Sequence, residues 1–102
     1  MSTEDQIFKY HLNLLTVFEE LPTKLTFDTI PLIYVTIDLI INFKQFIEAL
    51  PPFHQYPEGQ RALLASTLLP SLHLIDDIIS KIENHDTDPS LAFIHAAILD
   101  QI

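Results

Sequence analysis

The chain has 102 residues, enough for one domain, and 48% of them are hydrophobic, so a core can form without cross-links. It contains no cysteine, which excludes disulfides, thiolate metal sites and cysteine nucleophiles and fits a cytoplasmic location. Fourteen acidic residues outnumber five basic ones and give a net charge of −9. This balance disfavours direct binding to nucleic-acid phosphates or to an anionic membrane, because both require clustered Lys and Arg.

Glycine is nearly absent, since Gly59 is the one glycine in the chain. Sheets joined by tight hairpins usually need several glycines or Asn-Gly pairs to reach positive φ, and no such pair occurs here. We therefore predict an all-α fold, a small antiparallel bundle of about four helices that occupies residues 1–102 as a single domain. Helix content should exceed roughly 60%, with essentially no strand.

The first helix is predicted over about residues 5–21. Ser2 and Thr3 are suitable N-cap residues, and Pro22 ends the segment. Apolar residues recur at three- and four-residue steps and form one face: Ile7, Tyr10, His11, Leu14, Val17, Phe18 and Leu21.

A second helix is predicted over about 29–50. The many β-branched residues of 32–41 make a strand the alternative. The helix is favoured because Asp38, Asn42 and Gln45 form a single polar stripe at helical spacing. The rest of this helix is apolar nearly all round and must be buried on several sides. We therefore expect a homo-oligomer with this helix or the last one in the interface, through Ile33, Ile37, Ile40 and Ile41.

The loop at 51–57 carries Phe53, His54 and Tyr56. Phe53 and Tyr56 are candidates for anchoring a protein partner, and the alternative is that they fold back onto the core. A third helix is predicted from about 58 to 84, kinked at Pro70 or broken into two segments near Leu69. The apolar positions stay in phase across the proline, which favours the kink.

Asp88 and Pro89 form an N-cap and N1 pair that opens a last helix over about 89–102. The chain ends inside its apolar pattern, so we expect this end either to dock against another surface or to belong to a longer protein. Residues 82–102 hold four acids and no Lys or Arg. Asp86, Asp88 and Asp100 are therefore predicted to face a partner with a basic surface.

The best metal-ligand candidates are His73, Asp76 and Asp77, whose spacing places them within reach of one helix face. Carboxylate bundles that bind two metal ions need further paired ligands, which the sequence lacks, so the expectation is solvated side chains and no metal or other cofactor. The second cluster, Glu83, His85, Asp86 and Asp88, lacks the length and glycine of a calcium loop and is expected to be a solvated turn.

No secretory signal is expected, because the N-terminus lacks a basic and then an apolar region. The longest apolar stretch, 30–43, is interrupted by polar residues and is too short to span a bilayer. The leading functional hypothesis is a non-enzymatic protein–protein interaction module, a small acidic regulator, inhibitor or assembly factor that forms homo-oligomers. One alternative is an acidic mimic of nucleic acid that inhibits a DNA- or RNA-binding protein. The other is a metal-dependent enzyme or sensor that uses His73, Asp76 and Asp77.

Overall fold

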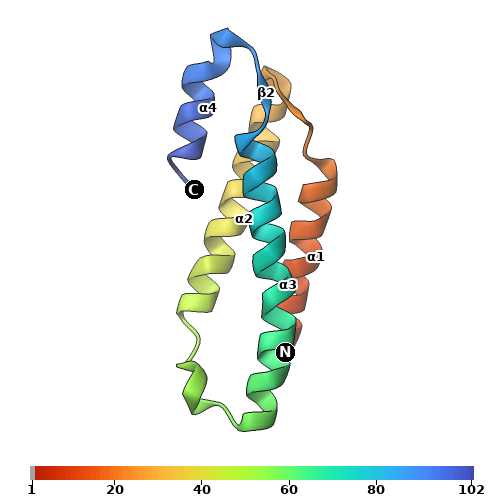
Figure 1. Ribbon diagram of the computed structural model, residues 1–102, viewed down its shortest axis with the longest axis vertical. Coiled ribbons are helices and arrows are strands. Elements are labelled where there is room, and N and C mark those ends of the chain that lie inside the picture. Colours follow the sequence, from red (N-terminus) through yellow and green to blue (C-terminus); the bar gives the residue numbers. More distant parts are fainter. Residues whose placement is uncertain (1) are drawn as a thin grey trace.

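The computed structural model describes residues 2–102, and 79% of the chain is helical, which confirms the predicted helix content. The molecule is elongated, with extents of 52 × 22 × 20 Å. Four α-helices follow one another along the chain (Figure 1): α1 Thr3–Glu20, α2 Ile30–Glu48, α3 Glu58–Glu83 and α4 Ala92–Leu99. Three short 3-10 helices lie in the connections: η1 Phe27–Thr29, η2 Phe53–Gln55 and η3 Pro89–Leu91.

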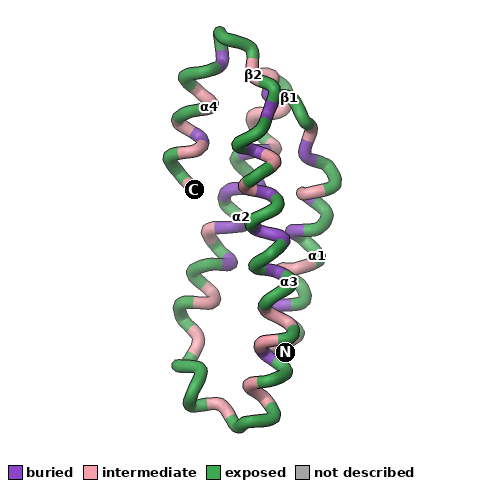
Figure 2. The backbone as a smooth tube through the Cα atoms, viewed as in Figure 1, coloured by how far each residue is buried: buried purple, intermediate pink, exposed green. Residues whose placement is uncertain are grey.

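The most extensive contact between helices is that of α1 with α3, which lie side by side along much of their length. Buried positions follow the inner faces of α1, α2 and α3, as the purple segments of Figure 2 show. Ile7 and Leu14 of α1 and Ile78 and Ile82 of α3 have no exposed side-chain surface. The core is therefore a long seam and not a compact centre.

The two loops at one end of the molecule form a small parallel sheet, although no strand was expected. Strand β1 Lys24–Leu25 follows α1, strand β2 Asp86–Thr87 follows α3, and Lys24 pairs with Asp86. The backbone N–H of Asp86 also donates to the Thr23 carbonyl at 2.9 Å. Extended backbone in each loop would leave N–H and C=O groups unpaired, and pairing the two loops satisfies several of these groups. Periodicity along one segment carries no information about this long-range pairing.

Helix starts follow the predicted capping residues. The Ser2 hydroxyl accepts a hydrogen bond from the Asp5 N–H at 3.1 Å and caps α1. The Asp88 carboxylate accepts from the Ser90 N–H at 2.9 Å, but the turn that follows is η3, so α4 begins later than expected, at Ala92. Residues 32–41 are helical, and the strand alternative is therefore wrong.

Helix α3 continues without interruption through Pro70, so the alternative of two separate segments near Leu69 is wrong. Its buried positions keep one phase on both sides of the proline: Leu64, Ser71, Leu74, Ile75, Ile78 and Ile82. Continuous burial on one face gives the tertiary packing that holds a proline inside a helix.

The isoleucines predicted to lie in an oligomer interface are instead largely part of the core. Ile33, Ile37 and Ile40 are at most 2% exposed within the single chain, and Ile41 is half-buried. The other helices of the same chain cover the α2 face that holds these three isoleucines, whereas Tyr34 and Val35 of α2 stay exposed. These three side chains therefore offer no free surface to a second copy in this conformation, which corrects the predicted location of the interface.

Candidate interaction surface

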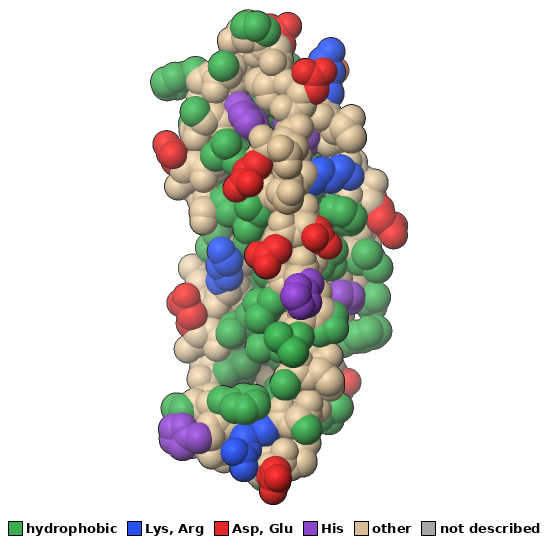
Figure 3. Space-filling model, in the orientation of Figure 1, with side chains coloured by type: hydrophobic (Ala, Val, Ile, Leu, Met, Phe, Trp, Pro, Cys, Tyr) green, Lys and Arg blue, Asp and Glu red, His purple; other side chains and the backbone are tan. Residues whose placement is uncertain are grey.

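The outer faces of α1 and α3 carry exposed apolar side chains. On α1 they recur at a spacing of four and then three residues, beside the buried face. We call this surface the apolar belt, made of Phe8, Leu12, Leu15, Leu63, Leu69 and Leu72. Each of these side chains is between 38% and 57% exposed. Figure 3 shows hydrophobic side chains gathered over α3 and along the neighbouring edge of α1. A surface of several adjacent exposed apolar side chains is typical of a protein contact site.

Five of the six belt residues, all except Phe8, lie in two uncharged stretches of sequence. Residues 10–18 of α1 and residues 62–75 of α3 contain no Asp, Glu, Lys or Arg. The structure sets these stretches beside each other, since Nδ1 of His11 lies 3.0 Å from the hydroxyl of Ser71. The centre of a protein interface is depleted of charge in the same way.

A hollow of about 290 Å³ lies in the groove between the two helices. Its lining residues are Phe8, His11, Ser66, Thr67 and Pro70. The hydroxyls of Ser66 and Thr67 both donate to the Leu63 carbonyl, at 2.9 and 2.8 Å, so they are already paired. The hollow therefore presents mainly an aromatic ring, a proline ring and aliphatic carbon to a ligand.

A second hollow, of about 330 Å³, lies in the same groove toward the loop end. Its lining includes Phe18, Asp77 and Lys81. The Lys81 ammonium donates to the Phe18 carbonyl at 3.0 Å and lies 4.8 Å from the centre of the Phe18 ring, so this cation is engaged within the chain. Asp77 is exposed. The upper part of the groove therefore contains both a carboxylate and an ammonium group of the chain, beside an aromatic ring.

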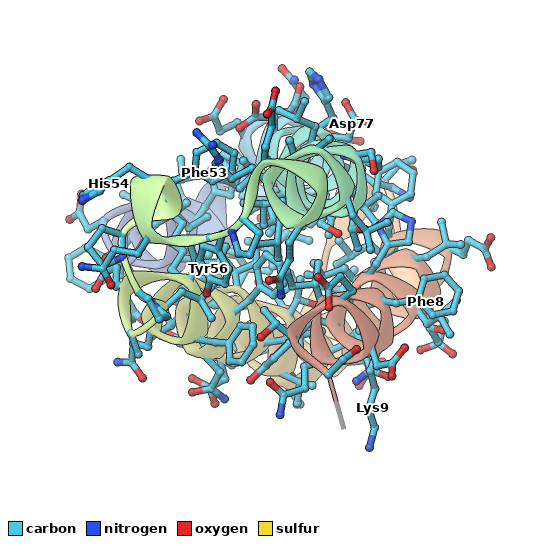
Figure 4. All side chains as sticks on the ribbon, turned by 90° about the horizontal axis from the view of Figure 1, so that it is seen from below. Phe8, Lys9, Phe53, His54, Tyr56 and Asp77 are labelled. Carbon is cyan, nitrogen blue, oxygen red and sulfur yellow. The ribbon has the colours of Figure 1, made fainter. Side chains whose placement is uncertain are left out.

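Two further basic residues, Lys9 and Arg61, lie near belt residues in the sequence. Lys9 lines a different hollow together with Tyr10 and Phe46, between α1 and α2. Figure 4 shows Phe8 and Asp77 toward the side where α1 and α3 meet, whereas Lys9 projects from the other side of α1. Arg61 is half-buried, and its Nε is buried without a hydrogen-bond partner among residues 2–102. The α1–α3 groove is therefore apolar in its lower part and carries Asp77 and Lys81 in its upper part.

The predicted metal ligands lie on the solvent side of α3. His73, Asp76 and Asp77 are all exposed, and within residues 2–102 no group of three His, Asp or Glu side chains is placed to share an ion. Asp77 lines the upper hollow. Among the described residues, His73, Asp76 and Asp77 do not form a set of metal ligands.

The aromatic loop divides into one exposed and one packed side chain. Phe53 is 55% exposed, whereas Tyr56 packs against the core. Both line an apolar hollow of about 290 Å³ at the far end of the molecule, together with Ile7, Leu64 and Leu68. Tyr56 therefore folds back onto the core, which was the alternative to its anchoring a partner. Phe53 stays exposed and is free to contact a protein partner.

The loop end holds a histidine that joins the two connections. Nε2 of His85 donates to the Pro22 carbonyl at 2.7 Å, and Nδ1 of the same ring is buried without a partner in the described part of the chain. Burial lowers the pKa of His85, and the nearby charges of His95 and Lys81 lower it further, against the opposing effect of the Pro22 hydrogen bond. His95 in turn donates from Nε2 to the Ile82 carbonyl at 2.9 Å. The prediction of a solvated turn at Glu83, His85, Asp86 and Asp88 is therefore wrong for His85. This side chain is 7% exposed and connects the two inter-helix loops.

The three aspartates predicted to face a partner are exposed. Asp86 lies in β2, Asp88 caps η3 and Asp100 follows α4. The hydrogen bonds from the backbone and hydroxyl of Ser90 lower the pKa of Asp88. All three carboxylates lie in the segment that follows α3, whereas the belt residues lie in α1 and α3.

Two helical stretches are long and apolar enough to cross a membrane, Phe27–Glu48 and Glu58–Glu83. In the most apolar 18-residue window of each, 28% of the residues are buried within the chain. Core helices of water-soluble proteins meet the same criteria of length and composition, and the cytoplasmic location stays a prediction.

Comparison with known proteins gives no match: no family model fits the chain, and neither a curated protein nor a solved structure is similar to it.

Proposed function

We propose that this chain is a non-enzymatic protein–protein interaction module, a small acidic regulator, inhibitor or assembly factor. The observation that carries the proposal is the apolar belt, which brings exposed apolar side chains of two helices together on an uncharged surface. Burying such side chains in a contact is favourable by about 25 cal/mol for each Å² removed from water. A protein partner supplies that burial without requiring any catalytic group.

The acidic surface supports a partner with basic groups. The net charge of −9 attracts a basic protein over distances of about a Debye length, so it speeds encounter, and apolar contact then slows dissociation. Asp86, Asp88 and Asp100 contribute to this attraction from the loop end. We expect that replacing all three by asparagine lowers the association rate with the partner and leaves the dissociation rate nearly unchanged.

We further propose that the chain acts in the cytoplasm as a homo-oligomer. Asp38 on α2 and the Asp76–Asp77 pair on α3 are exposed carboxylates that would be costly inside a bilayer. Self-association is supported by exposed apolar side chains on α2 and α4, namely Tyr34, Val35 and Phe93. These residues replace the buried isoleucines as the contact through which copies would associate.

Two finer features of the fold belong to the same proposal. We propose that successive helices run antiparallel, supported by the short connections and by the parallel β1–β2 pair, which places the end of α1 and the end of α3 together. We also propose that α3 bends at Pro70, because proline has no N–H to donate and its ring crowds the carbonyl of Ser66.

Affinity purification from the native source tests the proposed function. Tagged wild-type protein and the double variant Leu12→Ser, Leu69→Ser are compared, with Phe27→Ser as the matched control at an exposed site outside the belt. We expect a distinct partner with the wild type and the control, and its loss with the belt variant. Equal recovery by all three proteins, or catalytic turnover by the purified chain, would contradict the proposal.

A further inference from the structure

A hollow of about 390 Å³ lies between α1 and α2, on a different side of α1 from the belt. Figure 4 shows Lys9 projecting from that side, away from Phe8. The lining residues are Gln6, Lys9, Tyr10 and Asn13 of α1 and Phe46 of α2. The four residues of α1 occupy positions i, i+3, i+4 and i+7, which share one helix face over about 10 Å. The hollow therefore offers an ammonium group, two amides, a hydroxyl and aromatic carbon to a single ligand.

The aromatic wall of this hollow is held by the core. The Tyr10 ring meets the Phe43 ring edge to face at a centroid distance of 4.9 Å, and the tilted Phe46 ring at 5.4 Å. Phe43 has no exposed surface, so the wall is anchored to a side chain that cannot move freely. A wall that is already ordered costs little further entropy when a ligand packs against it. The rings of Tyr10 and Phe46 thus form a prepared surface for a flat apolar group.

Charge at this hollow selects an anion. Lys9 is the one charged residue of the lining, and no acidic residue contributes to it. Within residues 2–102, Lys81 is the single lysine whose ammonium donates a hydrogen bond, so the exposed Lys9 ammonium is not engaged by the chain. The acids closest to the lining residues in the sequence are Asp5 and Glu48, which are exposed and lie outside the lining. A strongly acidic protein therefore presents a free cation at this position.

We propose that this hollow binds a small aromatic monoanion, with its carboxylate at the Lys9 ammonium and its ring against Tyr10 and Phe46. The inference goes beyond the proposed function and adds a ligand site outside the belt. An apolar cavity of about 150 Å³ holds benzene, so a hollow of about 390 Å³ has room for one or two fused rings with a substituent. A monoanion is favoured over a polyanion such as nucleic acid, because the net charge of −9 repels a polyanion more strongly.

The test uses probes that separate charge from shape. Benzoate, benzamide and benzamidine are nearly isosteric, and at neutral pH they are anionic, neutral and cationic respectively. Titration of the full chain, followed by two-dimensional amide NMR, gives both the affinity and the location of each probe. Benzoate should bind about fivefold more tightly than benzamide, and benzamidine should bind least. The two-ring probe 2-naphthoate should bind more tightly than benzoate, and acetate, which has no ring, should bind more weakly than benzoate.

Variants then identify the groups that select the anion. Lys9→Gln should weaken benzoate by about fivefold and leave benzamide unchanged. Lys44→Gln is the matched control, since it removes the same charge from an exposed residue of α2 outside the lining and should keep wild-type affinity. The double variant Lys9→Gln, Asn13→Asp leaves a carboxylate as the one charge of the lining and should make benzamidine the tightest of the three isosteric probes. Both positions are exposed, and far-ultraviolet circular dichroism checks that every variant is folded.

Four results would overturn this inference. The first is the absence of saturable binding by benzoate and 2-naphthoate, and the second is equal affinity for benzoate and benzamidine. The third is an equal effect of Lys9→Gln and Lys44→Gln on benzoate. The fourth is a set of amide shifts confined to the apolar hollow around Phe53 and Tyr56, which would place the ligand at the far end of the molecule. None of these results bears on the belt, so the proposed interaction function is tested separately.

Discussion

The ring of His85 and the backbone of Pro22 connect the two inter-helix loops through a 2.7 Å hydrogen bond. A carbonyl can only accept, so the neutral ring carries its proton on Nε2, and Nδ1 is a bare acceptor. That Nδ1 is buried and unpaired among residues 2–102. Protonation of His85 would therefore place an N–H without an acceptor inside the loop end, near His95 and Lys81.

Acidification should destabilise the fold in the pH range in which His85 titrates. Burial lowers the folded-state pKa of His85 below its ordinary value of 6.5. Between these two pKa values the unfolded chain binds more protons than the folded chain, so the free energy of unfolding rises with pH across that window. Above about pH 7.5 His85 is neutral in both states and does not lower the free energy of unfolding. As pH falls below 6.5 toward the folded-state pKa, its titration lowers the free energy of unfolding progressively.

Urea unfolding at a series of pH values between 5 and 8 measures this effect. His85→Gln, which keeps an N–H donor but cannot be protonated, should flatten the pH dependence. His54→Gln, on an exposed loop, should leave it unchanged. Identical pH profiles for the wild type and His85→Gln would contradict the assignment.

Loss of the Ser71 hydroxyl should weaken the α1–α3 contact. Ser71 is completely buried, and its hydroxyl lies 3.0 Å from Nδ1 of the half-buried His11. Ser71→Ala leaves that nitrogen without a partner and should lower the free energy of unfolding by about 1–2 kcal/mol. Ser66→Ala removes an exposed hydroxyl of the same helix and should change it by less than about 0.5 kcal/mol. A larger loss for Ser66→Ala than for Ser71→Ala would show that the hydroxyl pair does not hold the helices together.

Two phenylalanines offer a matched comparison of core and surface. Phe43 has no exposed surface, and its ring meets that of Tyr10 edge to face at a centroid distance of 4.9 Å. Phe43→Ala should cost about 3–5 kcal/mol through lost burial and the cavity left behind. Phe27 is 70% exposed, and Phe27→Ala should change stability by less than about 0.5 kcal/mol. Thermal and urea unfolding measure both, and comparable losses would place Phe27 in a contact that a single chain does not show.

Self-association should depend on α2 and α4. We expect sedimentation at micromolar concentration to give a dimer or a larger assembly, and the double variant Val35→Ser, Phe93→Ser to give a monomer, because apolar contact area is lost. Phe8→Ser lies on the belt and should keep the wild-type assembly. A monomeric wild-type protein would remove the homo-oligomer from the proposed function.

The helices themselves could be predicted from local sequence. Ser2 and Asp88 are capping residues that act within a few positions of themselves, and Pro22 ends the first helix through its own geometry. The apolar spacing of α1 and α3 identified their buried faces in the same way. The exposed residues of the belt were missed, although the i, i+4, i+7 spacing of Phe8, Leu12 and Leu15 and the two uncharged stretches were present in the sequence.

Tertiary structure alone decided which of these faces are covered. The sequence led us to expect that one short chain could not cover the apolar surface of α2. Within the single chain, however, other segments bury Ile33, Ile37 and Ile40. The β1–β2 pair, the His85–Pro22 bond and the His11–Ser71 contact each join residues about 60 positions apart. Local periodicity determines which side of a helix is apolar, because it depends on one turn. Whether that side meets another helix or water depends on packing between distant segments, and so the belt became visible only in the folded chain.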